Sequence, residues 1–456
     1  MSQILYYSTN LKAGKASFRN ALLKGLAPDG GLYMPESIPR LSAAEIKSFS
    51  KKPYSEIAYT IAHKFLHDII TNDELMAVAR DAYDYTVPLE LVYDKKYIMR
   101  LDQGPTASFK DFAARMMGRL MQYYLRKENR NLLILTATSG DTGSAIANAF
   151  YGLENIQVVI LFPESEVTER QRKQMTTLHN NIQIVAIDGK FDDCQALVKK
   201  AFNDPDLEYL NLSSANSINI GRLLPQSMYY FYAYSRLCDI TLGEKIIFSV
   251  PSGNFGDLMG GLIAMKMGLP VKKFIVATNE NDEVPEYFKS GNYKTIIPSL
   301  KCISSAMNVG HPSNMARIVA LYGGVMNEKG EVVKVPDMEA MKHDMFTISI
   351  SDEETLDTLK KVYLRHKVLL EPHGSVGWAG LQHYFSFVPE DHQPDQVSVC
   401  LETAHPAKFP KEIQDVLGID PELPASLIGL EHKEERCIRI ENNYTIFKQL
   451  LKNNYS

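Results

Sequence analysis

The hydrophobic pattern of the chain changes character near residue 96. Before that point, apolar residues recur at helical spacing in three segments, residues 43–50, 54–66 and 73–83. Residues 24–36, KGLAPDGGLYMPE, hold three glycines and two prolines and therefore predict a loop with tight turns. We expect residues 1–95 to form a helical and irregular lead-in.

From Tyr97 onward, short apolar runs alternate with amphipathic stretches. The runs predict strands at residues 132–137, 157–162, 182–187, 246–250, 274–278 and 397–401. The stretches predict helices at residues 142–151, 167–178, 194–202, 223–237, 256–267, 353–365 and 375–385. This alternation predicts two α/β domains with parallel sheets, residues 96–240 and 241–456, with ligands at the carboxyl ends of the strands. The pattern in residues 280–345 and in the last fifty residues is mixed and assigns no element.

Composition narrows the class of protein. The 456 residues are 45% hydrophobic and 23% charged, which is ordinary for a globular protein of two or three domains. The net charge is −5 and no long basic run occurs, so nucleic acid and an anionic membrane surface are not expected as partners.

The cysteines and the apolar runs bear on the cellular compartment. The five cysteines are scattered without CxxC spacing, which predicts neither a disulfide framework nor a zinc site. No apolar run approaches ~18 residues, and the opening MSQILYYSTN lacks the pattern of a secretory signal. We expect a reduced, cytoplasmic protein.

Residues 103–117, QGPTASFKDFAARMM, form the first stretch that indicates chemistry. A Gly-Pro-Thr turn leads into apolar residues at helical spacing, with Ser108 as the expected N-cap and Asp111 as the acidic half of a capping pattern. Lys110 then lies in the first turn, where the helix dipole disfavours a cation. The neutral amine so favoured is the form required for Schiff-base chemistry. The alternative is an exposed lysine whose stem covers apolar surface.

Two further stretches are glycine-rich turns between a predicted strand and a predicted helix. Residues 136–144, TATSGDTGS, offer hydroxyl and N–H groups to an anion, or else are a helix cap made by Ser139 or Asp141. Residues 250–257, VPSGNFGD, present successive N–H groups that suit a phosphate dianion. The nucleotide motif GxxxxGK[ST] does not occur in the chain.

Polar stretches with cationic side chains follow other predicted strands. Residues 211–222, NLSSANSINIGR, end in an arginine and predict either an anion pocket or a solvated loop. Residues 402–410, ETAHPAKFP, carry His405, for which we expect a structural role. His373, in EPHGSVG, lines a pocket or caps a helix. In VGHPSNMAR, Ser313 and Asn314 are read as helix caps or as residues near the site.

The segment GPTASFKDFAAR resembles the lysine segment of the threonine synthase family, whose members are pyridoxal-phosphate enzymes of fold type II. The resemblance continues, in order, through GLAPDGGLYMPE, TATSGDTGSA, SANSINIGR, SVPSGNFGD and ETAHPAKF. It implies two αβα domains with parallel sheets, pyridoxal 5'-phosphate in the cleft between them, and a mostly helical N-terminal segment.

The resemblance also implies roles for individual residues. Lys110 would hold the cofactor as a Schiff base and then act as the general base at the substrate Cα. The remaining roles are cofactor phosphate for Gly253, Asn254, Phe255, Gly256 and Asp257, pyridine nitrogen for Thr403, and substrate carboxylate for Ser139 and Thr142. A phosphorylated substrate needs a second anion site, and the stretches NSINIGR and HPAKF each follow a predicted strand and carry a cation. We therefore expect Arg222 and Lys408 to contact the substrate phosphate, with Asn216 and Ser217 in the same anion pocket. Asp141 stands where many fold-type-II relatives have asparagine, so we expect it to be structural or a cap.

The activity that the resemblance implies is the conversion of O-phosphohomoserine and water to threonine and inorganic phosphate, without a metal. A phospholyase or dehydratase that yields 2-oxobutyrate on the same scaffold is the alternative within enzymes. A phosphate- or nucleotide-binding protein without catalysis is the alternative from another class. Monomer and homodimer both remain open.

Overall fold

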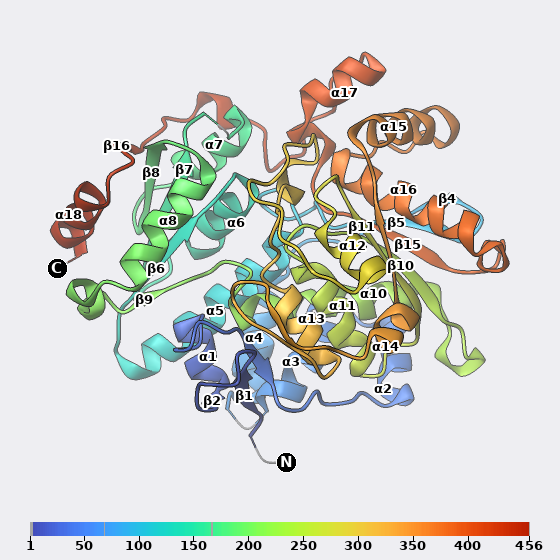
Figure 1. Cartoon of the computed structure of the whole chain (residues 1–456), viewed down its shortest axis with the longest axis horizontal. Helices are drawn as coiled ribbons and strands as arrows, with labels where there is room; N and C mark the ends of the chain where they lie inside the picture. Colours follow the sequence, from blue (N-terminus) through green and yellow to red (C-terminus); the bar gives the residue numbers. More distant parts are fainter. Residues whose placement is uncertain (1–2, 68, 166, 456) are drawn as a thin grey trace.

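The computed structural model describes residues 3–67, 69–165 and 167–455 and contains two large sheets, drawn in different halves of Figure 1. The larger sheet has the strand order β14-β11-β10-β15-β5-β4, and the smaller has β16-β8-β7-β6-β9. Neighbouring strands in both sheets are parallel, except for the antiparallel pair β4 and β5. The expected α/β architecture with parallel sheets is confirmed.

The strands of the larger sheet are β4 (Leu89–Tyr93), β5 (Lys96–Arg100), β10 (Ile246–Pro251), β11 (Val271–Thr278), β14 (Met345–Ser349) and β15 (Ser398–Glu402). Those of the smaller sheet are β6 (Leu132–Ala137), β7 (Ile156–Pro163), β8 (Ile182–Asp188), β9 (Leu212–Ser213) and β16 (Ile438–Glu441). Two small antiparallel sheets consist of β1 (Leu5–Ser8), β2 (Ala16–Ser17) and β3 (Tyr33–Pro35), and of β12 (Val325–Met326) and β13 (Val332–Lys334).

Helices cover both large sheets and form the lead-in at the bottom of Figure 1. The first nine are α1 (Phe18–Lys24), α2 (Ala43–Ser48), α3 (Tyr54–Leu66), α4 (Asn72–Ala82), α5 (Lys110–Glu128), α6 (Asp141–Phe150), α7 (Glu169–Thr176), α8 (Phe191–Phe202) and α9 (Leu223–Gln226). The others are α10 (Met228–Leu237), α11 (Gly256–Lys266), α12 (Glu283–Ser290), α13 (Met315–Leu321), α14 (Met338–Asp344), α15 (Asp352–His366), α16 (Pro372–Phe387), α17 (Pro410–Leu417) and α18 (Tyr444–Tyr455). Helix α8 packs on β6 and β7, and α16 packs on β10, β11 and β15.

Most predicted elements occur where the hydrophobic period places them. Helix α3 and strand β6 have the predicted bounds, and the other predicted helices and strands differ mainly at their ends. The single helix predicted over residues 223–237 is wrong, because the chain divides into α9 and α10 at Ser227. There the Ser227 hydroxyl donates to the carbonyl of Leu224 at 2.7 Å, and Pro225 has no N–H for the helical ladder.

The sheets do not follow the predicted domain boundaries at residues 95 and 240. Strand β5, near the first boundary, pairs with β15 from the far end of the chain. Strand β16, which no pattern predicted, pairs with β8 of the smaller sheet, and the following helix α18 packs on α8. The chain therefore contributes to each half of the molecule twice.

Helix α5 joins the lead-in to the rest of the core. Its buried face contacts α1, α4, α6 and α9. Phe112 on this face packs against the rings of Tyr54, Tyr83, Tyr85 and Tyr229, three of which come from the lead-in and its connection to β4. Burial of one such aromatic side chain stabilises the fold by about 2–3 kcal/mol. These contacts fix the start of α5, where Lys110 lies.

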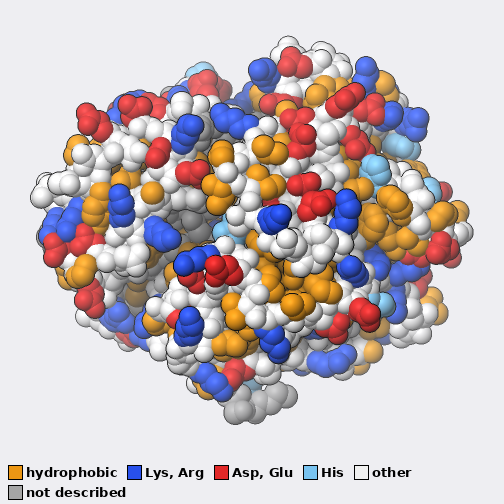
Figure 2. Space-filling model, in the orientation of Figure 1, with side chains coloured by type: hydrophobic (Ala, Val, Ile, Leu, Met, Phe, Trp, Pro, Cys, Tyr) orange, Lys and Arg blue, Asp and Glu red, His pale blue; other side chains and the backbone are white. Residues whose placement is uncertain are grey.

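None of the described helices is long and apolar enough to cross a membrane. On the face shown in Figure 2, acidic and basic side chains are interspersed, with hydrophobic side chains between them.

Candidate active site

The loop before α5 places Lys110 at the first position of the helix. The Asp111 carboxylate accepts hydrogen bonds from the N–H and the hydroxyl of Thr106, at 2.8 and 2.6 Å, and so closes the turn. At Gly104 a Cβ would lie 2.4 Å from the Asp111 carboxylate, so the turn needs glycine there. The predicted N-cap is wrong, because Phe109 occupies the cap position and the buried Ser108 hydroxyl bonds no described residue.

Lys110 itself is half-buried, and its ammonium nitrogen makes no hydrogen bond to a described residue. The nearest opposite charge is the Asp141 carboxylate, 3.9 Å away. Burial lowers the pKa of Lys110, Asp141 opposes that shift, and the cations of Lys408 and Arg222 add to it. The first-turn position is confirmed, and burial is the largest cause of the lowered pKa.

Asp141 holds a second lysine more closely than Lys110. The Lys408 ammonium lies 2.6 Å from Oδ1 of Asp141 and donates to the carbonyl of Thr106 at 3.1 Å. The Gln171 amide also donates to Oδ1, at 2.9 Å. Burial opposes ionisation of Asp141, but the ammonium groups of Lys408 and Lys110 outweigh it and hold the pKa of the carboxyl below its ordinary range. The Lys408 side chain has 0% exposure, so its ammonium is not presented to a ligand.

The glycine-rich turn after β6 is capped by Thr138. Its hydroxyl accepts from the N–H groups of Gly140 and Gly143, at 3.0 and 2.8 Å. The cap by Ser139 or Asp141 that the sequence suggested is therefore wrong. Ser139 is exposed and Thr142 is half-buried, and their N–H groups bond no described acceptor. Gly140 has φ 134°, a conformation that favours glycine. The turn leaves donors free at the start of α6.

The turn after β10 leaves a row of free donors at the start of α11. Phe255 has the left-handed φ of 58°, which lets residues 253–256 curl over the helix end. None of the N–H groups of residues 253–256 bonds a described acceptor. The carbonyl of Asn254 accepts from the side chain of Asn314 at 3.0 Å. This arrangement is an anion site at a helix N-terminus.

Asp257, expected as the last contact in that turn, directs its carboxylate away from the free donors. Oδ1 accepts from the hydroxyls of Tyr229 and Tyr230 at 2.5 and 2.8 Å, and the buried Oδ2 bonds no described residue. Burial raises the pKa of Asp257 to about 6. Its side chain anchors α11 to α10, so its contact with an anion would run through its N–H.

Arg222 ends the 3₁₀ turn η3 (Ile220–Arg222), and its guanidinium is only partly bonded. Nη1 donates to the carbonyl of Ala215 at 3.0 Å, while the buried Nε bonds no described residue. Burial lowers the pKa of Arg222 to about 10, and Asp111 opposes the shift. The buried Oδ1 of half-buried Asn216 is also unbonded among the described residues. This loop therefore contains two buried polar atoms, Nε of Arg222 and Oδ1 of Asn216, that make no hydrogen bond to a described residue.

Arg317 and Asn314 connect the loops, and sequence reasoning assigned neither of them this role. Arg317 is fully buried and donates to the carbonyls of Tyr33, Ser217 and Ile218. The Asn314 side chain bonds Arg317 and the carbonyls of Ser217 and Asn254, and it makes no cap bond. Nothing in the pattern VGHPSNMAR distinguishes a buried arginine from an exposed one.

Thr403 lies beside the lysine loop. Phe109 N–H donates to the carbonyl of Thr403 at 2.9 Å, and His405 N–H donates to the carbonyl of Ala107 at 3.0 Å. The Thr403 side chain is buried, and its hydroxyl bonds no described residue. His405 Nδ1 accepts from Ala407 N–H at 3.1 Å, and burial lowers the pKa of His405 to about 4. His405 is thus a cap of the turn η7 (Pro406–Lys408), as expected.

His373 is buried in a hydrogen-bond chain behind Thr403. Its Nε2 accepts from Ala306 N–H at 3.1 Å, so Nδ1 carries the hydrogen that bonds Glu371 at 2.5 Å. The N–H of Glu371 in turn donates to Glu402 at 2.8 Å. Burial and the neighbouring Glu371 raise the pKa of Glu402 well above its ordinary value. These hydrogen bonds link Glu402, at the end of β15, to Ala306, which lies beside the turn after β10.

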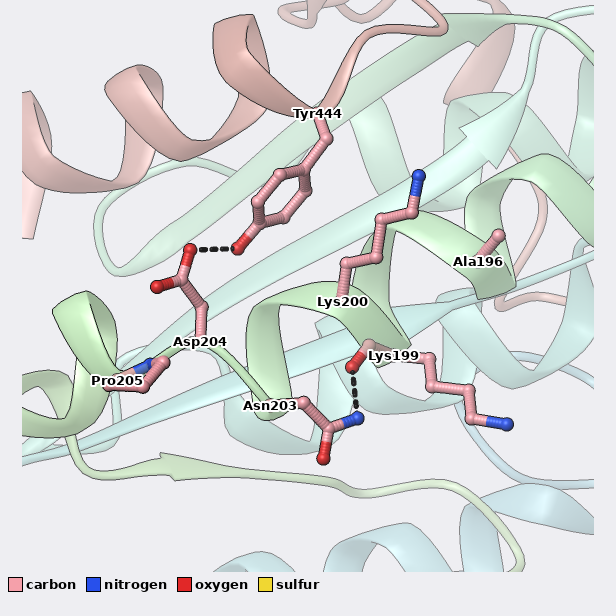
Figure 3. A pocket seen from close by; sticks show the side chains of 7 residues that line it. All are labelled: Ala196, Lys199, Lys200, Asn203, Asp204, Pro205 and Tyr444. Atoms are coloured by element: carbon pink, nitrogen blue, oxygen red, sulfur yellow. Dashed lines mark hydrogen bonds between the residues drawn. The ribbon is translucent and has the colours of Figure 1, made fainter.

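Two other features contain no predicted site residue. Glu280, Cys302 and Asp352 could offer ligands to a metal ion, although burial raises the pKa of the Cys302 thiol to about 11. A pocket of about 550 Å³ lies between the end of α8, the turn η2 (Pro205–Leu210) and α18. In Figure 3 the hydroxyl of Tyr444 bonds Asp204 across this pocket.

Three family models match the chain. One described as threonine synthase N terminus matches residues 5–83, and one described as pyridoxal-phosphate dependent enzyme matches residues 90–401. A third, described as threonine synthase, C-terminal, matches residues 379–451.

Individual proteins are similar over nearly the whole chain. The threonine synthase of Haemophilus influenzae is 40% identical over 419 residues, 91% of this chain and 91% of its own. The structure of pyridoxal-phosphate-bound threonine synthase from Brucella melitensis matches with a TM-score of 0.90 and 33% identity, over 99% of this chain and 100% of that chain. The threonine synthase structure from Escherichia coli matches with a TM-score of 0.86 and 35% identity, over 98% and 99%.

Proposed function

The chain belongs to the threonine synthase family of pyridoxal-phosphate-dependent enzymes, and we propose that Lys110 is the residue that binds its cofactor. The observation that carries this proposal is the state of the Lys110 amine. The amine makes no hydrogen bond to a described residue, and burial lowers its pKa. A neutral amine with a free lone pair is the form that reacts with an aldehyde.

The residues around Lys110 fit pyridoxal phosphate. The four N–H groups of residues 253–256 have no acceptor among the described residues and suit the cofactor phosphate. The Thr403 hydroxyl makes no hydrogen bond to a described residue and suits the pyridine nitrogen. A hydroxyl does not hold that nitrogen protonated, so the ring withdraws electrons less strongly than beside a carboxylate. The N–H of Asp257, with its carboxylate held by two tyrosines, completes the phosphate contacts.

For the substrate, we assign the two remaining sets of free donors. Ser139 and Thr142, with their N–H groups at the start of α6, bind the substrate carboxylate. Arg222, together with Asn216 and Ser217, binds the substrate phosphate, since the arginine fork suits phosphate oxygens and its Nε is unused. Lys408 was expected to join them. Because its ammonium is buried against Asp141, Lys408 is not among the proposed substrate contacts.

The enzyme is a pyridoxal-phosphate-dependent lyase, and its reaction converts O-phospho-L-homoserine and water to L-threonine and phosphate. The bound cofactor supplies an electron sink for charge at the substrate Cα. With the cofactor bound, Lys110 would be the base that removes the Cα proton of the substrate. A positioned base of this kind contributes ~10²–10⁴-fold.

The test is incubation with O-phospho-L-homoserine while phosphate, threonine and 2-oxobutyrate are measured together. We expect phosphate and threonine in equal amounts. 2-Oxobutyrate in place of threonine would establish the alternative, a phospholyase or dehydratase on the same scaffold. Release of neither product, with a bound phosphate compound, would favour a binding protein.

The oligomeric state and the cellular location complete the proposal. The proposed site draws every residue from one chain, so it is compatible with both a monomer and a homodimer. The five cysteines are scattered along the sequence without CxxC spacing, which supports a reducing, cytoplasmic location. Gel filtration of the purified chain distinguishes monomer from homodimer.

A further inference from the structure

One carboxylate faces two lysines in the centre of the site. Asp141 Oδ1 lies 2.6 Å from the Lys408 ammonium, whereas Oδ2 lies 3.9 Å from the Lys110 ammonium. Lys408 also donates to the carbonyl of Thr106, whereas Lys110 makes no hydrogen bond to a described residue. The carboxylate is thus shared unequally, and Lys408 holds the closer position.

The unequal distances from Asp141 to the two lysines matter because of the charges around Lys110. The groups that act on it electrostatically are Asp141 from α6, Lys408 from η7, Arg222 from η3 and Glu371 at the start of α16. A charge in such a buried place is costly unless it is paired. Since Lys408 neutralises Asp141, a proton on Lys110 would add an unbalanced positive charge beside Arg222. Without Lys408, Asp141 would have Lys110 as its nearest cation.

We propose that Lys408 is a positioning residue, which occupies Asp141 and so leaves Lys110 as a free amine. The inference rests on the proposed function, in which Lys110 is the reacting lysine. It gives a reason for two buried charges, the aspartate in the turn TATSGDTGS and the lysine in HPAKF. The two residues form one unit, and the role belongs to the pair.

The experiment measures the Lys110 amine directly in the full chain after removal of the cofactor. Trace acetylation with acetic anhydride across a pH series, followed by mass spectrometry of the Lys110 peptide, yields the midpoint of its reactivity. Lys408→Met should move this midpoint upward by about one pH unit or more, because Asp141 then pairs with Lys110. Lys411→Met is the matched control, since it removes an exposed charge from the same segment and should leave the midpoint in place.

A second pair of variants separates the charge from the packing. In Asp141→Asn the Lys110 midpoint should fall below that of the wild type, because the carboxylate nearest to Lys110 is removed while the Lys408 ammonium remains. The double variant Asp141→Asn, Lys408→Met removes the neutral pair together, so its Lys110 midpoint should stay close to that of the wild type and below that of Lys408→Met. The double variant buries no unpaired charge at these positions, so it gives a comparison with the wild type even where Lys408→Met or Asp141→Asn alone does not fold.

An unchanged or lowered Lys110 midpoint in Lys408→Met, or a midpoint in the double variant about one pH unit or more above that of the wild type, would overturn the proposal. The readout does not depend on turnover or on bound cofactor. If borohydride reduction attaches no cofactor to Lys110, the proposed role of Lys110 fails. The acetylation midpoints still report on the pair of lysines in that case.

Discussion

The N–H of Phe109 donates a hydrogen bond to the carbonyl of Thr403 at 2.9 Å, joining the loop before Lys110 to the loop after β15. His405 N–H completes the pair by donating to the carbonyl of Ala107. The two loops therefore run antiparallel for a short distance. The backbone of Thr403 and the start of α5 are therefore held in one frame, and with them the proposed reacting amine and the residue proposed for the pyridine nitrogen.

Lys110→Ala should abolish the covalent attachment of cofactor that borohydride makes permanent, and turnover with it. The free energy of unfolding should change by no more than about 1 kcal/mol, because the side chain makes no hydrogen bond. Mass spectrometry of the reduced protein and urea unfolding provide the two measurements. Lys127→Ala, an exposed lysine at the other end of α5, is the control and should retain the adduct. An adduct that survives in Lys110→Ala would show that another lysine binds the cofactor.

Thr403→Asp should change the absorbance spectrum of the bound cofactor and reduce phosphate release. A carboxylate beside the pyridine nitrogen favours its protonated form and changes how the ring accepts charge. Thr403→Ser keeps a hydroxyl and should retain the wild-type spectrum. If the aspartate variant matches the wild type in both spectrum and turnover, Thr403 does not contact the cofactor.

Arg222→Ala should weaken the use of O-phosphohomoserine by at least about tenfold, since a charge-assisted hydrogen bond contributes ~1.5–3 kcal/mol. Side activity on serine or threonine, which carry no phosphate, should change little. Steady-state rates on both kinds of substrate give the comparison. Equal losses on both would mean that Arg222 supports the loop through its bond to Ala215 and does not bind the substrate phosphate.

Arg317→Met should lower the free energy of unfolding by about 3–5 kcal/mol, as measured by urea unfolding. The arginine is fully buried and donates to the carbonyls of Tyr33, Ser217 and Ile218. Its loss removes three hydrogen bonds, and among the described residues only the carbonyl of Ser217 keeps a second donor, the amide of Asn314. Asn314→Ala removes a neighbouring amide from the same cluster and should cost less. A loss below about 1 kcal/mol for Arg317→Met would mean that water or rearrangement replaces its bonds.

Glu283 should make stability depend on pH. It is 3% exposed, its Oε2 bonds no described residue, and burial raises its pKa from 4.5 to about 8. As pH rises between these values, the unfolded chain loses a proton that the native chain retains. The contribution of Glu283 to stability is therefore present at low pH and falls by about 1.4 kcal/mol per pH unit until both states are ionised.

Glu283→Gln removes this titration, so its stability relative to the wild type should rise by a few kcal/mol between about pH 5 and pH 8. Urea unfolding at the two pH values gives the difference. Glu286→Gln, on the exposed side of the same helix, should follow the wild type. Parallel pH profiles for Glu283→Gln and the wild type would place the titration elsewhere.

The sequence by itself determined the elements and the places where chemistry is expected. The period of apolar residues located α3 and β6, because burial of one face requires that spacing whatever the partner is. Glycine-rich turns after β6 and β10 were found in the same way, since a backbone that offers its N–H groups needs residues without side-chain obstruction. Lys110 was found through its place at a predicted helix start and through the family resemblance of its segment.

The tertiary structure alone decided which groups are used up inside the protein and which remain free. Thr138, not Ser139, caps α6, and Asp257 faces two tyrosines. Lys408 is bound by Asp141, and β16 returns to the smaller sheet. Each of these outcomes depends on contacts between residues far apart in the chain. Local spacing constrains the direction of a side chain but not its partner, and for a buried charge the partner decides the protonation state.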